Sequence, residues 1–272
     1  MSASGAAVTA SAAVWTPVPA PAASPPGLWR PVPVRERVAG EGAVTRALLA
    51  MGHDVRDDRV LAERICRACI DGLDIDGAAI SLRTAGTLRQ TLYASDPTSD
   101  LLEELQFTLG EGACMDAART GRPVLVPDMD DVAESARWPF YAEAVVELAG
   151  VAAVFALPLQ WATINLGVLD LHRTAAGSLP KAQLSDALGA ADIAALMLLG
   201  QRTNPGEDRL WERSWGGRME IHQATGMVLA QLDVTATDAF ARLRAYAFLE
   251  HRLLGDVARD VVARRLRFTE DT

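Results

Sequence analysis

The chain has 272 residues, of which half are hydrophobic and 22% are charged, a composition typical of a soluble protein with a packed core. Its formal net charge of −9 argues against a protein that coats nucleic acid along its whole surface. The charge is uneven, however. Residues 241–267 contain seven arginines and three acids, a balance of 7 − 3 = +4 that leaves −13 for the remainder. A basic end on an acidic body indicates an anionic partner for that end alone.

Cysteine usage and hydropathy indicate a compartment. Three cysteines cannot all pair in disulfides, and the first residues lack the basic start and long apolar core of a signal peptide. We therefore expect a cytoplasmic protein. The fully apolar runs are shorter than the roughly 20 residues that a membrane span requires, so no membrane association is expected.

The N-terminal part of the chain changes character twice. Residues 1–35 are rich in Ala, Pro, Ser and Val, and prolines at this density predict a disordered leader. Apolar residues then recur at three- and four-residue steps up to Leu73, which predicts helix. Residues 77–84 and 88–95 alternate with a period of two and predict a β-hairpin that turns at residues 85–87.

Helices and strands alternate over the next hundred residues. A short helix at 99–105 precedes the glycine-flanked loop L-G-E-G-A-C, a strand near P-V-L-V-P-D-M and a helix near W-P-F-Y-A-E-A. Two strands, 151–160 and 165–174, and a long helix, 181–201, complete the predicted unit. We expect residues 36–203 to form an α+β domain with an antiparallel sheet and helices on one side of it.

A Pro-Gly break at residues 203–207 separates a helical tail, residues 204–272. Its periodicity predicts helices at 218–231, 237–249 and 255–264, with Thr237 as a candidate cap of the second. About 55 residues in three helices form a marginal core, so we expect support from the preceding domain or from a second copy of the chain.

Several of these motifs resemble known families. L-Q-F-T-L-G-E-G-A-C-M-D-A, W-P-F, A-L-P-L and L-G-V-L-D-L-H-R are similar to a GAF domain over about residues 40–201, with Ala113 where that family usually has proline. I-H-Q-A-T-G-M-V-L-A-Q-L and D-V-A-R-D-V-V-A-R-R-L resemble an ANTAR domain, whose first helix commonly reads Ala-Lys-Gly; here Thr225 replaces the lysine. The resemblance implies a GAF-like antiparallel sheet flanked by helices, an all-α ANTAR-like tail, RNA binding and transcription antitermination.

Gly226 lies inside the first predicted tail helix, where glycine costs about 1 kcal/mol relative to alanine. Two interpretations explain the cost: close approach of another helix backbone, or direct contact with a ligand. We prefer the first, because the stripe of Ile221, Val228 and Leu232 is expected to pack on the other two tail helices.

The basic side chains of the tail are the candidate RNA contacts, because phosphate contacts provide most of the affinity for RNA. An aromatic ring there can stack on an unpaired base. The alternative is a solvated basic face with the aromatic residues in the core, which is our interpretation of Tyr246. The ANTAR resemblance favours RNA for these candidates: Arg242, Arg244, Phe248, Arg259, Arg264 and Arg267.

The cysteines and histidines do not indicate a metal site or a cofactor. Cys66 and Cys69 lie inside a helical pattern, whereas a redox pair needs a helix N-terminus, and the four histidines show no paired spacing. We interpret Cys69 as core. Cys114 is a candidate thiol sensor, a chromophore attachment point or, as we prefer, an inner residue after a turn shaped by Gly110 and Gly112.

The sequence shows no catalytic triad and no cluster of paired carboxylates, so an enzyme is not expected; a GAF-type sulfoxide reductase remains an alternative. Our leading hypothesis is a cytoplasmic regulator whose GAF-like domain senses a small molecule, a redox state or a partner. Its tail then binds RNA hairpins in nascent transcripts, and a homodimer would present two tails. The main alternative is a non-enzymatic sensor whose tail docks on an acidic protein.

Overall fold

A computed structural model describes residues 42–51, 55, 57–83, 89–162, 164–202 and 219–269. The predicted leader at residues 1–35, the hairpin turn at 85–87 and the break at 203–207 lie outside these ranges. Within them, the predicted succession of helices and strands is present, and all of the described residues belong to one unit.

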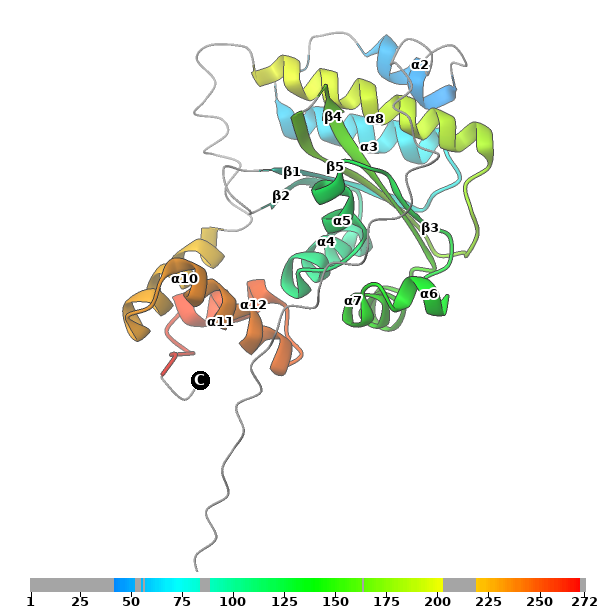
Figure 1. The fold of residues 1–272 in the computed structure, drawn as a ribbon. Coiled ribbons are helices and arrows are strands. Elements are labelled where there is room, and N and C mark those ends of the chain that lie inside the picture. The colour runs from blue at the N-terminus through cyan, green and yellow to red at the C-terminus, as the bar shows by residue number, and fades with distance from the viewer. Residues whose placement is uncertain are drawn as a thin grey trace, which may run out of the picture. The chain divides into compact units, whose positions relative to one another are not determined.

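The centre of the fold is a five-stranded antiparallel sheet with the order β2-β1-β5-β4-β3 (Figure 1). The predicted hairpin is confirmed as β1 and β2. Strands β4 and β5 form a second hairpin. The strands are β1 (Gly77–Arg83), β2 (Arg89–Ala94), β3 (Val124–Val126), β4 (Ala153–Trp161) and β5 (Ile164–Arg173).

Helices cover both faces of the sheet, so the expectation of helices on one side was wrong. Alternate residues of the central strands enter two separate cores: Ile80 and Phe155 pack in one, and Val154 and Val168 in the other. Strands buried on both faces have no polar side, and the sequence therefore could not show a single solvent-facing surface.

The first core is closed by α2 (Ala43–Ala50), α3 (Asp58–Gly72) and α8 (Lys181–Arg202). The second is closed by α4 (Pro97–Leu109), α5 (Ala113–Thr120), α7 (Pro139–Ala144) and the π-helical turn η2 (Val145–Ala149); α6 (Val132–Ser135) precedes α7. Figure 1 shows α3 and α8 on one side of the strands and α4 and α5 on the other.

Helix α4 is longer than the sequence predicted, because both of its ends are well defined. The Asp96 carboxylate accepts a hydrogen bond from the Ser99 N–H at 2.9 Å, and Pro97 occupies the first turn. Gly110 ends the helix in the left-handed conformation, with φ of 72°. The helix therefore spans Pro97–Leu109 and places its second half beside both the sheet and the tail.

Gly167 lies where β1 and β5 approach closely. A Cβ atom at this position would lie 2.0 Å from the Ser81 carbonyl oxygen and 2.9 Å from the Leu82 Cα. Both neighbours are backbone atoms of the adjacent central strand and cannot move independently of it. Only glycine fits there, next to the β-bulge between Ile80 and Ser81.

Helix α8 is long and apolar enough, by length and composition alone, to cross a membrane. It lies against the sheet, however, and half of its most apolar 18-residue window is buried. Ala187, Ala190, Ala194 and Leu198 are all part of the first core. The core helices of soluble proteins have the same composition, so the apolar character of α8 is accounted for by packing.

The tail forms the three predicted helices, α10 (Met219–Leu232), α11 (Ala236–Leu249) and α12 (Leu254–Val262). The predicted packing is confirmed: Ile221 and Val228 share a core with Leu243, Val257 and Val261. The predicted cap was wrong by two residues. The Thr235 hydroxyl, not that of Thr237, accepts the N–H of Asp238 at 3.2 Å and donates to the Asp238 carboxylate at 2.7 Å.

The predicted role of Gly226 was also wrong. The residue is exposed, and a Cβ atom added to it would meet nothing within 4 Å. No other helix among the described residues approaches it, because the buried face of α10 is formed by Ile221, Ala224 and Val228. The glycine leaves a stretch of bare helix backbone on the outer surface of the tail.

We expect Gly226→Ala to stabilise the tail by about 0.5–1 kcal/mol, because alanine loses less backbone entropy on folding and has room here. The matched control is Ala230→Gly at an exposed position of the same helix, which should destabilise the tail by a similar amount. Urea unfolding followed by far-ultraviolet circular dichroism measures both changes. A destabilised Gly226→Ala protein would show that the position is crowded.

The tail rests on the second half of α4, which supplies one of the two supports that its small core was expected to need. The rings of Phe107 and Phe240 lie 5.8 Å apart between centroids. The Thr108 hydroxyl accepts the N–H of Leu254 at 3.1 Å, and the Thr108 carbonyl oxygen accepts a hydrogen bond from the Arg244 Nε at 2.9 Å.

Candidate functional site

Acidic neighbours hold three arginines of the tail. Arg259 forms an ion pair with Asp256 one turn away on α12. Arg252 and Arg265 both reach Asp260, at 2.5 and 2.7 Å. All of these pairs lie at the surface, where an ion pair is worth little and is readily exchanged for another anion. They lower the positive charge of this surface without sealing it.

The other four arginines of residues 241–267 form no ion pair with any residue in the part of the chain that the structure describes, and three of them face solvent at least in part without contacting α4. Arg264 and Arg267 are exposed just beyond the end of α12, and Arg242 is half-buried on α11. Arg264 has a left-handed backbone, with φ of 58°.

Arg244 points toward α4 and not toward open solvent. Besides its bond to the Thr108 carbonyl oxygen, its guanidinium carbon lies 5.9 Å from the ring centroid of Phe240. Burial lowers the pKa of Arg244, and the nearby Glu111 carboxylate opposes that change. In this arrangement Arg244 contacts the sheet-containing unit, and an RNA would have to displace those contacts to reach it.

Phe248 is 39% exposed, and its ring meets the Phe140 ring edge-to-face with centroids 4.7 Å apart. Part of the ring is therefore already covered by an aromatic side chain of α7. Tyr246 packs edge-on against the buried Phe268 at 5.4 Å, in line with its interpretation as core.

The Gly-Glu-Gly loop has a structural role that agrees with the turn interpretation. Its two glycines have positive φ, 72° at Gly110 and 129° at Gly112. One oxygen of Glu111 accepts the N–H groups of Phe140 and Tyr141 at 2.9 and 2.8 Å, which satisfies the first turn of α7. Burial raises the pKa of Glu111, although both of these hydrogen bonds lower it.

Cys66 and Cys69 are fully buried in the first core, which confirms the interpretation of Cys69 as a core residue. Burial raises the pKa of Cys69 to about 12 and raises that of Cys66 well above its ordinary value. Thiols that stay protonated and have no access to solvent are poor nucleophiles and poor redox partners.

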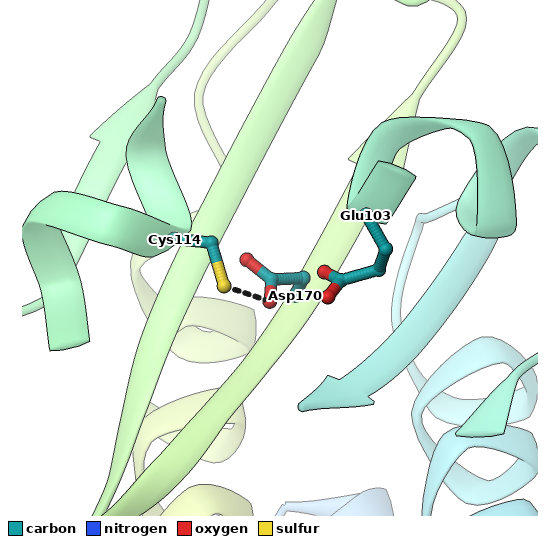
Figure 2. Close-up of side chains that lie close together, drawn as sticks. All are labelled: Glu103, Cys114 and Asp170. Atoms are coloured by element: carbon teal, nitrogen blue, oxygen red, sulfur yellow. Dashed lines mark hydrogen bonds between the residues drawn. The ribbon is translucent and has the colours of Figure 1, made fainter. Parts of the chain in front are cut away.

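The fold brings together three side chains that the sequence did not connect: Glu103 of α4, Cys114 of α5 and Asp170 of β5 (Figure 2). Their ligand atoms all lie within 4.8 Å of one another. The Cys114 thiol donates to the Asp170 carboxylate, with 2.6 Å between sulfur and oxygen. The only sequence signal was the presence of acidic residues at inward positions of an apolar helix and an apolar strand.

Beside this cluster lies a cavity of only about 10 Å³. Pockets for organic ligands typically measure about 300–1,000 Å³, whereas about 10–15 Å³ holds a single water molecule. Glu103, Asp170, Ser99, Tyr141 and His172 are among the residues that line it. In this conformation the site accommodates a water molecule or an ion but no organic molecule.

His172 introduces a pH dependence. Burial lowers its pKa, and the facing Asp96 and Asp76 carboxylates partly oppose the shift. Because the folded pKa lies below the unfolded value of about 6.5, the unfolded chain takes up the proton first as the pH falls. Stability from this group is present above about pH 6.5 and is lost as the pH falls toward the folded pKa.

We therefore expect the wild-type protein to lose more stability than His172→Gln when the pH falls from about 7.5 to about 5.5. Urea midpoints of both proteins at the two values measure the difference. Asp96 and Asp76, whose pKa values are lowered, titrate below this window and affect both proteins alike. Equal losses would remove His172 as the cause.

Comparisons with known proteins agree with this architecture. Residues 55–212 match the GAF domain family and residues 213–262 match the ANTAR domain family. The GAF match covers more than half of the chain, which therefore belongs to the GAF domain family. The tail that follows matches the ANTAR domain family, so the chain combines two regulatory domains.

Similar solved structures share low sequence identity with the chain, and no curated protein matches it. The cyanobacteriochrome TePixJ GAF domain has a TM-score of 0.46 and 15% identity, over 57% of this chain and 98% of that chain. A domain of a putative two-component sensor histidine kinase from Sinorhizobium meliloti has a TM-score of 0.44 and 16% identity, over 53% of this chain and 92% of that chain. A free methionine-R-sulfoxide reductase from Thermoplasma acidophilum has a TM-score of 0.41 and 14% identity, over 53% of this chain and 92% of that chain.

Proposed function

We propose that the protein is an RNA-binding transcription antitermination regulator in which the GAF domain receives a signal and the ANTAR domain binds RNA hairpins. The observation that supports it is the set of accessible cations on the ANTAR domain: Arg242, Arg264 and Arg267, together with Arg259 in its exchangeable surface pair. Cations of this kind bind phosphate, which dominates RNA affinity. The match to the ANTAR family favours RNA over another polyanion.

The contact between α4 and the tail supports a means of control. A signal can shift the protein between two arrangements only if it binds one of them better than the other. Arg244 and Phe248 both contact the GAF domain in the present arrangement. An arrangement that released them would add a cation and an aromatic ring to the RNA-binding surface. Our mechanism is that the signal selects between these two states.

The remaining parts of the proposal concern setting and assembly. We further propose that the protein acts in the cytoplasm and catalyses no reaction; Cys66 and Cys69, at least, are unsuited to redox turnover. It acts as a homodimer, so that two tails engage two hairpins and gain from effective concentration. Sedimentation of the full chain tests the dimer, and a monomer at micromolar concentration would contradict it.

The decisive experiment is charge reversal of Arg242, Arg264 and Arg267, which form neither an ion pair within the described residues nor the α4 contact that Arg244 makes. We expect full-length Arg242→Glu/Arg264→Glu/Arg267→Glu to bind a labelled tandem-hairpin RNA on the order of 100-fold more weakly at about 0.15 M salt. The slope of log affinity against log salt should also fall by about three, one for each phosphate that an arginine no longer neutralises.

The matched control is Arg64→Glu/Arg67→Glu/Arg122→Glu, which makes the same charge change at exposed positions of the GAF domain, two on α3 and one just after α5. Its RNA affinity should stay within a few-fold of wild type, since exposed charges beyond a Debye length of about 8 Å are screened. Equal losses of affinity in the two triple variants would contradict the site assignment. A tail that enriches a protein but no hairpin class from cell extract would favour the protein-docking alternative.

A further inference from the structure

Three separate elements deliver metal-ligand side chains to one buried point. Glu103 comes from the middle of α4, Cys114 from the first turn of α5 and Asp170 from β5, and Figure 2 shows the three side chains converging. Their ligand atoms lie within 4.8 Å of one another. Two ligand atoms at about 2.0–2.3 Å from a tetrahedral Zn²⁺ ion are about 3.3–3.8 Å apart, so shifts of about 1 Å are needed. Small side-chain rotations therefore suffice to place all three on one ion.

A second observation, the hydrogen bonding of Glu103, indicates that this point binds a cation. Glu103 is only 4% exposed, yet its Oε1 atom has no hydrogen-bond partner among the residues that the structure describes. The other oxygen, Oε2, accepts hydrogen bonds from the hydroxyls of Ser81 and Thr91. Leaving a buried carboxylate oxygen unpaired is costly, and a cation offsets that cost as well as the repulsion from Asp170.

The chemistry of the donors limits the class of ion. One thiol and two carboxylates form a mixed sulfur and oxygen set, which suits borderline divalent ions such as Zn²⁺, Fe²⁺ and Co²⁺ better than Mg²⁺ or Ca²⁺. The adjacent cavity of about 10 Å³ accommodates an ion or a water molecule but no organic ligand. The Ser81 and Thr91 hydroxyls hold Glu103 in place, as outer partners of metal ligands commonly do.

We propose that Glu103, Cys114 and Asp170 form a binding site for a divalent first-row transition-metal ion. On binding, the Cys114 thiol loses its proton to solvent, its S–H···O hydrogen bond to Asp170 is replaced by a metal–sulfur bond, and both carboxylates coordinate the ion. Three protein ligands leave one position of a four-coordinate ion open to water or to a small signal molecule. The site stands independently of RNA binding.

Cobalt is the probe, because thiolate-bound Co²⁺ has a strong charge-transfer band in the near ultraviolet. We expect full-length wild type to bind one Co²⁺ per chain with this band, and Zn²⁺ to displace the cobalt. Cys114→Ser should lose the band. Glu103→Gln and Asp170→Asn should weaken Co²⁺ binding at least about tenfold. Affinity should rise with pH, since binding releases a proton.

The matched control is Cys66→Ala/Cys69→Ala, in which Cys114 is the sole remaining cysteine. This variant should keep the band, and Asp100→Asn, at an exposed acid of α4, should keep full affinity. Because removal of a buried partner can itself weaken folding, circular dichroism of each metal-free variant accompanies the titration. Excess Zn²⁺ should also raise the thermal midpoint of wild type but not of Cys114→Ser.

Absence of the thiolate band in folded wild type would overturn the proposal. So would its persistence in Cys114→Ser, or its loss from a folded Cys66→Ala/Cys69→Ala protein. These outcomes are read from spectra of the protein alone and are unaffected by the results of the RNA experiment.

Discussion

Gly167→Ala should destabilise the GAF domain by at least about 3 kcal/mol, because the added methyl group would collide with the backbone of the neighbouring central strand. The nearest atom, the Ser81 carbonyl oxygen, would be 2.0 Å away, far inside van der Waals contact. Relief requires β1 and β5 to separate, which breaks the pairing at the centre of the sheet. A loss of this size is a large part of the stability of an ordinary domain.

Urea unfolding followed by circular dichroism measures this effect, with Gly200→Ala as the matched control. Gly200 lies in α8, and a Cβ atom there would meet nothing within 4 Å. The control should therefore be stabilised by about 0.5–1 kcal/mol, the usual gain for alanine over glycine in a helix. Equal behaviour of the two variants would show that the strands have more room than the structure indicates.

Leu243→Ala should unfold the ANTAR domain while the GAF domain stays folded. Leu243 is fully buried on α11, and its truncation weakens the packing against α10 and α12 together. Truncation of a buried leucine costs about 2–5 kcal/mol, more than a small three-helix core is expected to spare. RNA affinity should fall to the level of the GAF domain alone, because the cations lose their fixed positions.

Leu249→Ala is the control for this experiment, since Leu249 is on the same helix but 72% exposed. It should change stability by less than about 0.5 kcal/mol and leave RNA binding intact. Helix content and RNA affinity are measured for both proteins at the same temperature. If Leu243→Ala bound RNA as well as Leu249→Ala, binding would not require a folded tail.

The order of the elements could be predicted from the sequence, because period-two and period-3.6 patterns depend on neighbours a few residues apart. The hairpin of β1 and β2, the long α8 and the three tail helices all appear where that periodicity indicated. The number of helical layers could not be predicted. It depends on which faces of β1, β4 and β5 are covered, and strands buried on both faces give no polar signal.

The site could be predicted only in part, for the same physical reason. Composition and motif indicated the basic tail, but not which arginines are engaged. Arg244 donates a hydrogen bond to the carbonyl oxygen of Thr108, which is 136 positions away in the sequence. No pattern of neighbouring residues can predict a contact over that separation. The cluster of Glu103, Cys114 and Asp170 is likewise assembled from three elements, and only their folding makes them neighbours.

Helix α4 serves both halves of the protein at once, and this has a consequence for any shortened form. A chain that ended after α8 would place the Phe107 ring in water, and would leave Phe140 without the Phe248 ring that covers it. The Thr108 carbonyl oxygen would also lose the hydrogen bond that it accepts from Arg244. Exposed aromatic rings beside an unsatisfied helix end favour self-association, so the isolated GAF fragment should be less soluble than the whole chain.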